Sequence, residues 1–151
     1  MGTYLESYTY DLVGNILSLQ HAGSDPVMDA DLHYQEKSQL EPSYFNNRVG
    51  ETIIGNSIQT YGYDGLAGLH GAMTSMPQLS MIQWTCDDQI GSTARQVVSN
   101  GGTPETTYYV YDMKGIRVRK VTERATSTSE APRRTKERIY LSDYEIFRKF
   151  A

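Results

Sequence analysis

The sequence lacks the features that mark several common classes of protein. A single cysteine, Cys86, excludes an internal disulfide framework and a cysteine-rich zinc site. No apolar run approaches the ~20 residues that a membrane-spanning helix needs, so we expect no membrane span. The N-terminal residues carry neither the basic nor the apolar stretch of a secretory signal peptide. We therefore expect a cytoplasmic chain, or one secreted without a standard signal peptide.

Aliphatic residues are also scarce. Leu, Ile, Val and Phe together make up 30 of the 151 residues, close to the ~20% below which chains are often disordered. Tyrosine compensates, with 12 copies against 1 Trp and 3 Phe. It favours strands and buries a large ring while its hydroxyl reaches water. The composition therefore predicts strands whose apolar surface is largely aromatic and partly wet.

The net charge of −4 is unevenly distributed. Residues 1–113 hold 3 Lys and Arg against 13 Asp and Glu, whereas residues 114–151 hold 11 against 5. The basic segment could bind nucleic acid or an acidic surface, but lysine and arginine also keep exposed sheet faces and edges soluble. We therefore expect a solvated sheet surface here rather than a nucleic-acid site. The basic residues concerned are Arg117, Arg119, Lys120, Arg124, Arg133, Arg134, Lys136 and Arg138.

Catalytic and cofactor-binding motifs are absent. None of the Gly-x-Ser-x-Gly, Walker and Rossmann patterns occurs. The three histidines lack ligand partners at metal-binding spacing, nothing signals a base beside Cys86, and Asp87–Asp88 is expected to lie in a solvated turn. We therefore predict a non-enzymatic chain with no catalytic residue, no metal site and no cofactor.

One short pattern occurs three times along the chain. It reads Tyr-x-Tyr-Asp and is followed within a few residues by glycine. Its members are Tyr8, Tyr10, Asp11, Gly14 and Asn15 in the first copy, Tyr61, Tyr63 and Asp64 in the second, and Tyr109, Tyr111, Asp112 and Gly115 in the third. The second copy continues into the glycine-rich residues 65–71 instead of a compact turn.

Each copy has the composition of a β-hairpin. Tyrosines two residues apart place both rings on one face of a strand. Aspartate at the strand end can accept hydrogen bonds from N–H groups of the turn, and glycine supplies the positive φ that a tight turn requires. Apolar residues then return at 16–19 and 116–121. We interpret the repeated residues as structural, with ring packing and turn capping as their roles.

Short apolar and aromatic runs fill much of the remaining chain, and none has the 3.6-residue period of a helix. They cover residues 32–35, 52–54, 81–84, 96–98, 138–141 and 144–148. The sequence therefore predicts an all-β fold in which antiparallel β-hairpin repeats form a curved ribbon. We expect a single partial domain over residues 1–151, with a flexible loop at residues 122–136.

The repeated pattern resembles the YD repeat of the Rhs and toxin-complex proteins. The stretches Met73–Leu79, Gln83–Gln89, Tyr108–Val121 and Arg138–Arg148 look most like the repeat core of toxin-complex C components. The resemblance implies a ribbon of hairpins that closes into a shell around a toxin domain and does no chemistry on it. The implied partners are further YD-repeat segments or a B-type shell partner, with an enclosed toxin cargo.

The sequence departs from that family in ways that limit the comparison. The family's end-of-core segment and its protease aspartates do not occur among these residues, so no autoproteolytic residue is assigned. We therefore expect a structural segment of a partial YD-repeat shell. The alternative is a carbohydrate-binding module, because exposed tyrosine faces flanked by aspartate acceptors also suit sugar stacking and hydroxyl bonding.

Overall fold

The computed structural model is all-β and antiparallel, which confirms the fold class predicted from the sequence. It describes residues 4–22, 29–38, 40–64, 71–95, 104–124 and 131–150. Within these ranges the chain forms 13 strands and no helix. The described residues accordingly include no helix that is long and apolar enough to cross a membrane. The strands group into two compact units, whereas the sequence predicted a single domain.

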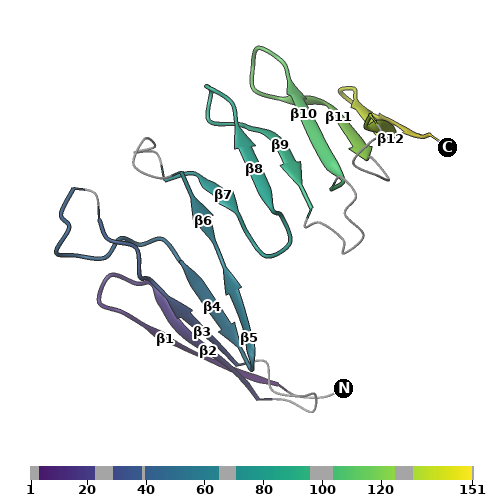
Figure 1. Ribbon diagram of the computed structural model, residues 1–151. Coiled ribbons are helices and arrows are strands. Elements are labelled where there is room, and N and C mark those ends of the chain that lie inside the picture. Colours follow the sequence, from purple (N-terminus) through teal and green to yellow (C-terminus); the bar gives the residue numbers. More distant parts are fainter. Residues whose placement is uncertain are drawn as a thin grey trace. The chain divides into compact units, whose positions relative to one another are not determined.

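The first unit spans Met1–Gly71. Its strands are β1 (Leu5–Tyr10), β2 (Ile16–Ala22), β3 (Ala30–His33), β4 (Glu51–Ile54), β5 (Ser57–Thr60) and β6 (Gly62–Tyr63). Strands β1 to β5 form one sheet in which each strand lies beside the next in sequence (Figure 1). All four strand pairs of this sheet are antiparallel, so the sheet is a series of consecutive hairpins.

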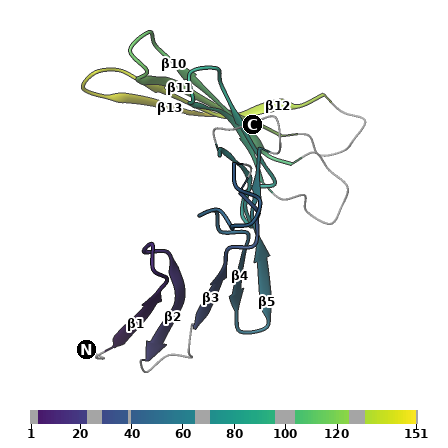
Figure 2. The same ribbon diagram turned by 90° about the vertical axis from the view of Figure 1, so that its left-hand side faces the viewer.

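The second unit spans Ala72–Ala151. Its strands are β7 (Met73–Ser75), β8 (Met81–Trp84), β9 (Ile90–Ala94), β10 (Thr106–Tyr111), β11 (Arg117–Arg124), β12 (Arg133–Tyr140) and β13 (Glu145–Lys149). Strands β8 to β13 form a six-stranded antiparallel sheet, again in sequence order. Figure 1 labels β8 to β12 in that order, and Figure 2 labels β10 to β13 from another side. In each unit, most strands are therefore hydrogen-bonded to the strands that precede and follow them in the sequence.

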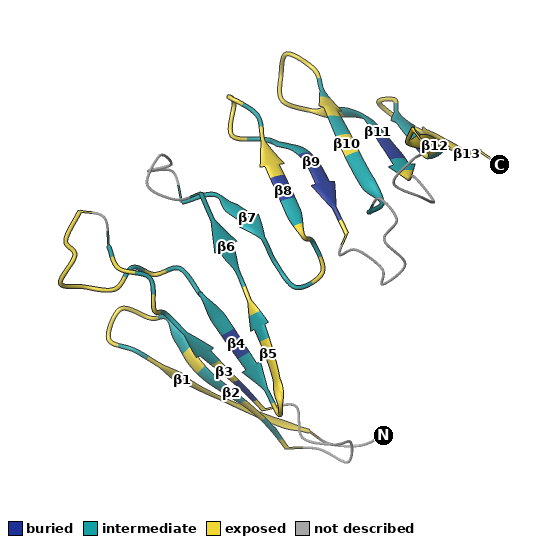
Figure 3. Cartoon of the chain, in the orientation of Figure 1, coloured by how far each residue is buried: buried dark blue, intermediate teal, exposed yellow. Residues whose placement is uncertain are grey.

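Few side chains are deeply buried in either unit. The buried apolar residues are Ala30, Ile82, Ala94 and Val121, and the buried polar ones are Thr52, Ser92, Thr93, Thr122 and Glu137. They all lie within strands, and most other described residues are half-buried or exposed (Figure 3). Large rings and hydroxyl-bearing side chains thus cover sheet faces that stay partly wet, as the aromatic-rich composition predicts.

The loop expected at residues 122–136 is wrong at both ends. Strand β11 continues to Arg124, and β12 already begins at Arg133. The two strands stay paired beyond the expected limits, because Thr122 pairs with Lys136 and Glu123 pairs with Arg134 across a bulge. The Thr135 hydroxyl also donates to the Thr122 carbonyl at 3.1 Å. Residues 125–130 lie outside the described part, as do residues 96–98, where a strand was expected.

Candidate functional site

Asp11 closes the turn between β1 and β2. Its N–H donates to the Asn15 carbonyl at 3.0 Å, and its own carbonyl accepts from the Gly14 N–H at 3.2 Å. Carboxylate Oδ1 accepts from the N–H groups of Val13 at 3.0 Å and Asn15 at 2.8 Å, and Oδ2 accepts from the Asn15 amide at 2.7 Å. Partial burial raises the pKa of Asp11, but these hydrogen bonds outweigh it and hold the pKa below its ordinary value. Gly14 has φ 92°, in the left-handed region that favours glycine.

Asp112 closes the turn between β10 and β11 in the same way. Its N–H donates to the Ile116 carbonyl at 2.9 Å, and its carbonyl accepts from the Gly115 N–H at 3.0 Å. Oδ1 accepts from the N–H groups of Lys114 and Ile116, each at 2.9 Å. Gly115 has φ 77°. Both turns lie next to a register shift in the strand pair, between Thr9 and Tyr10 in one hairpin and between Val110 and Tyr111 in the other.

A third turn has the same geometry without a capping aspartate and without a turn glycine. Between β8 and β9, the Thr85 N–H donates to the Gln89 carbonyl at 2.7 Å, and the Thr85 carbonyl accepts from the Asp88 N–H at 3.2 Å. The Thr85 hydroxyl accepts from the N–H groups of Asp87 at 3.3 Å and Gln89 at 3.2 Å. Asp88 takes the glycine place with φ 56°. Asp87 and Asp88 lie exposed in this turn, as predicted. The capping role of Thr85 was not predicted, because threonine replaces the aspartate of the repeated pattern.

The second predicted copy is only partly visible. The Tyr61 hydroxyl accepts from the Thr52 hydroxyl at 3.3 Å, and Tyr63 ends β6. Asp64 is half-buried directly after that strand. The turn glycines expected after it fall in residues 65–70, outside the described part. Gly71, with φ 74°, stands two residues before β7, as Gly14 stands two residues before β2.

Aromatic side chains at the ends of outgoing strands, or directly after the end in the case of Tyr34, connect consecutive hairpins. Each donates a hydrogen bond from its ring O–H or N–H to a backbone carbonyl at the start of an earlier return strand. We call these residues the aromatic ladder. The four bonds run from Tyr34 to Ile16 at 3.1 Å, from Tyr63 to Val49 at 3.0 Å, from Trp84 to Met73 at 2.8 Å, and from Tyr111 to Ile90 at 2.9 Å. Each bond lies within one unit.

The acceptors of the ladder occupy equivalent places. Ile16, Met73 and Ile90 are the first residues of β2, β7 and β9, and Val49 stands just before β4. Burial raises the pKa of Tyr34 and of Tyr63, so their hydroxyls stay protonated and able to donate. Tyr63 and Tyr111 belong to the predicted repeat, whereas Tyr34 and Trp84 do not.

The remaining predicted tyrosines differ in exposure. Tyr8 and Tyr10 stack with ring centres 6.4 Å apart and are 43% and 57% exposed. The Tyr8 hydroxyl donates to Glu6 at 2.9 Å, and this bond raises the pKa of Tyr8 above its ordinary value. Tyr109 of β10 is half-buried, with its hydroxyl 3.2 Å from that of Thr93.

A buried carboxylate joins three strands of the second unit. Glu137 of β12 is 3% exposed. Its Oε1 accepts from Arg119 Nε at 2.9 Å and lies 3.5 Å from Arg134, while Oε2 lies 3.4 Å from Arg148. The hydrogen bond from Arg119 holds the pKa of Glu137 below its ordinary value, although desolvation acts in the opposite direction. This cluster was not predicted from sequence, because its members come from β11, β12 and β13.

The described residues contain no cluster of His, Cys, Asp and Glu that could hold a metal ion. Cys86 is exposed beside Asp87 in the turn between β8 and β9. No model of a known protein family matches this sequence, and no curated protein matches it closely enough to indicate a relationship. The capped turns and the aromatic ladder are therefore the basis for a functional proposal.

Proposed function

We propose that this chain is a non-enzymatic segment of a hairpin-repeat wall, of the kind that forms a toxin-enclosing YD-repeat shell. The observation that carries the proposal is the aromatic ladder. It places the same contact at successive hairpins, each donor reaching back to a preceding return strand. Repeats that contact only their neighbours can be extended by adding further repeats, and a container wall needs that property.

The pattern of burial supports a wall. A compact domain buries the apolar face of its sheet under a second layer, whereas the described strands bury only four apolar side chains. Turn capping and ladder bonds instead satisfy backbone groups within the sheet. Such a sheet can have one wet face toward an enclosed space and the other toward solvent.

The outermost strands of the sheets supply surfaces for further repeats. Strands β1 and β13 stand at the ends of the two strand orders, and every residue of both is exposed. An edge strand presents unpaired N–H and C=O groups that template another strand. Tyr10, at the ladder position of the first hairpin, is 57% exposed. We propose that further YD-repeat hairpins, or a B-type shell partner, pair with these edges around a toxin cargo.

Edge pairing can be tested by sedimentation velocity over a range of protein concentrations. The Phe150 N–H donates to Thr135 of β12, and backbone direction alternates along a strand, so the Phe147 N–H points away from β12. Phe147→Pro removes that outward donor, and Phe147→Thr keeps it while removing the same ring. We expect concentration-dependent association that Phe147→Pro reduces and Phe147→Thr retains. A monodisperse monomer at every concentration would contradict the proposal.

The carbohydrate alternative has less support. The hydroxyls of Tyr63 and Tyr111 are engaged with backbone carbonyls of Val49 and Ile90, so these rings hold the sheet together. A glycan array tests the alternative: it predicts hits that Tyr63→Ala or Tyr111→Ala abolishes while the fold is retained. An array without hits, or hits indifferent to both substitutions, eliminates it.

A further inference from the structure

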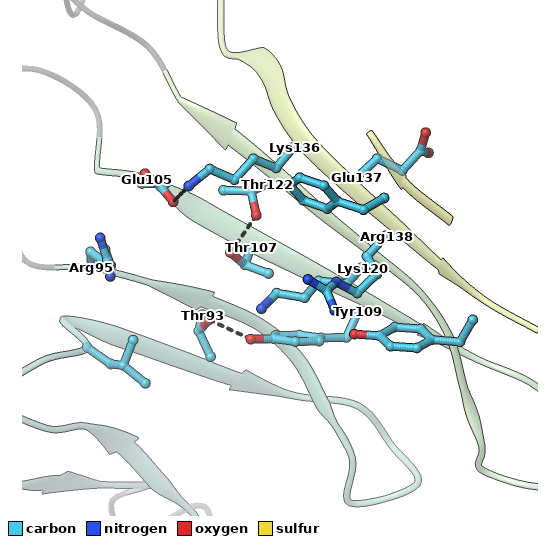
Figure 4. A pocket seen from close by; sticks show the side chains of 13 residues that line it. Thr93, Arg95, Glu105, Thr107, Tyr109, Lys120, Thr122, Lys136, Glu137 and Arg138 are labelled. Carbon is cyan, nitrogen blue, oxygen red and sulfur yellow. Dashed lines mark hydrogen bonds and ion pairs between the residues drawn. The ribbon is translucent and has the colours of Figure 1, made fainter. Parts of the chain in front are cut away.

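A concave site lies on one face of the second unit, across strands β9 to β13. Its volume is about 460 Å³, within the range of roughly 300–1,000 Å³ typical of small-ligand sites. Figure 4 shows the labelled side chains of Thr93, Thr107, Tyr109, Lys120 and Lys136 gathered around it. None of these residues takes part in the turns or the aromatic ladder.

One row of the site is formed by hydroxyl groups on adjacent strands. Thr93 pairs with Thr107, Thr107 with Thr122, and Thr122 with Lys136. Cross-strand partners share a face of the sheet, and neighbouring strands lie roughly 4.8 Å apart. The hydroxyls of Thr107 and Thr122 are 3.1 Å apart. The row therefore offers donors and acceptors at regular intervals. It ends in the Lys136 ammonium group, which lies 3.6 Å from the Glu105 carboxylate.

The second row is cationic and aromatic. Tyr109 pairs with Lys120, Lys120 with Arg138, and Arg138 with Phe147. Like charges at directly opposite positions on neighbouring strands destabilise a sheet. Lys120 and Arg138 occupy such opposite positions on β11 and β12. Arg138 contacts Glu145 at the outer strand. No acidic side chain in the described ranges lies within ion-pair distance of Lys120.

The geometry points to an anionic oligosaccharide as the ligand. We propose that this face binds a short chain of sugar rings bearing carboxylate or sulfate groups. An acid group seated between Lys120 and Arg138 would relieve their repulsion and form charge-assisted hydrogen bonds. The sugar hydroxyls would bond to the row that includes Thr107 and Thr122. The proposal does not depend on the chain being part of a shell.

Single-stranded nucleic acid fits this site less well. Its bases require open aromatic faces for stacking, but each ring here already has a cation near its centre. Arg117 lies 4.8 Å from the Tyr140 centroid, Arg138 lies 5.3 Å from that of Phe147, and Lys120 lies 5.8 Å from that of Tyr109. An acidic sugar needs no stacking, because hydroxyl and charge contacts suffice to bind it.

Isothermal titration calorimetry of the full chain tests the proposal with four probes. They are trigalacturonate, a sulfated trisaccharide, neutral maltotriose and oligothymidylate. We expect at least one of the two acidic trisaccharides to bind, and the two arms to show which acid group is preferred. Maltotriose is expected not to bind. Lys120→Gln removes one charge from the site and should weaken the binding about tenfold.

Lys114→Gln is the matched control, because it removes the same charge from the exposed turn between β10 and β11. It should leave the affinity unchanged. The proposal is overturned if neither acidic trisaccharide binds, if maltotriose binds as tightly, or if both lysine variants weaken binding equally. Oligothymidylate binding that depends on Lys120, with no trisaccharide binding, would instead identify a nucleic-acid site and also overturn it.

Discussion

A single side-chain oxygen organises each of three hairpin turns. In two of them it belongs to Asp11 and Asp112, and in the third to the Thr85 hydroxyl. In every case it accepts from the N–H groups two and four residues later. In a tight turn those N–H groups have no partner on a neighbouring strand. The capping oxygen therefore accepts hydrogen bonds from backbone groups that would otherwise bind water.

Asp112→Ala should therefore destabilise the second unit. Removing one acceptor shared by two N–H groups is expected to cost about 1–2 kcal/mol of unfolding free energy. Asp112→Asn should cost less, because its amide oxygen can still accept. Urea denaturation followed by the fluorescence of Trp84 measures both. The control is Asp143→Ala in the turn between β12 and β13, which closes through the Leu141–Tyr144 backbone bond. Equal losses for Asp112→Ala and Asp143→Ala would contradict the capping role.

Asp88→Gly should stabilise the chain. Asp88 is the non-glycine residue with positive φ among the described positions, at 56°, and this conformation is strained for an L-residue with a side chain. Glycine relieves that strain but loses more entropy on folding, so we expect a net gain of about 0.5 kcal/mol. The same urea experiment measures it. A loss of stability would show that the Asp88 side chain does more than occupy the turn.

Residue patterns predicted the aspartate turns but not their variants. The pattern Asp-x-x-Gly in the first and third copies indicates both a hydrogen-bond acceptor and a residue with positive φ. The turn-capping roles of Asp11 and Asp112 could therefore be predicted from the sequence. Thr85 and Asp88 supply the same acceptor and the same φ with other residue types. The adjacent Asp87 and Asp88 indicated an exposed turn, which the structure confirms, but nothing in the sequence indicated Thr85 as its cap. Tyr34 was missed because no turn motif follows it, and its hydrogen bond to Ile16 depends on how the hairpins lie together.

Strands β11, β12 and β13 are joined by Glu137 as well as by their backbone ladders. The folded state lowers the pKa of this carboxyl group from its ordinary value of 4.5. Its contribution to stability is therefore fully present above that value and is lost as the pH falls below it through the folded-state pKa. We expect Glu137→Gln to lower the urea midpoint at pH 7, and the difference between the two proteins to shrink as the pH is lowered from 7 to 3.

Glu145→Gln provides the comparison, because it removes the partner of Arg138 from an ion pair in which both side chains are well exposed. Exposed pairs contribute little, so its midpoint at pH 7 should stay close to that of the wild type. If Glu137→Gln keeps the same deficit at pH 3 as at pH 7, the cluster contributes through packing rather than through charge.

Strand boundaries were predicted well where short apolar runs occur. β8 and the end of β4 coincide with the predicted runs at residues 81–84 and 52–54, whereas β9 reads Ile-Gly-Ser-Thr-Ala and gave no signal. The predicted loop at residues 122–136 was too long because threonine and charged residues looked like linker. The partner strand supplies their hydrogen bonds, and that pairing is not visible in local sequence.

The chain as a whole replaces a large core with repeated local contacts. Only four apolar side chains are buried among the described residues. The main stabilising interactions are therefore the hydrogen bonds between neighbouring strands, the capped turns and the aromatic ladder. This organisation matches the proposed wall better than it matches an enzyme, whose reacting groups must converge in one sheltered site. The three predicted Tyr-x-Tyr-Asp copies, spread along the chain, are consistent with the same view.

The aromatic ladder is the central claim, and replacement of tyrosine by phenylalanine at each rung tests it most directly. Tyr34→Phe, Tyr63→Phe and Tyr111→Phe each delete one hydroxyl that donates to a backbone carbonyl. Each should lower the unfolding free energy in urea by about 1 kcal/mol. The exposed residues Tyr108 and Tyr144 serve as controls, and their phenylalanine variants should stay within about 0.5 kcal/mol of the wild type. If all five variants are equally stable, the ladder does not hold the hairpins together.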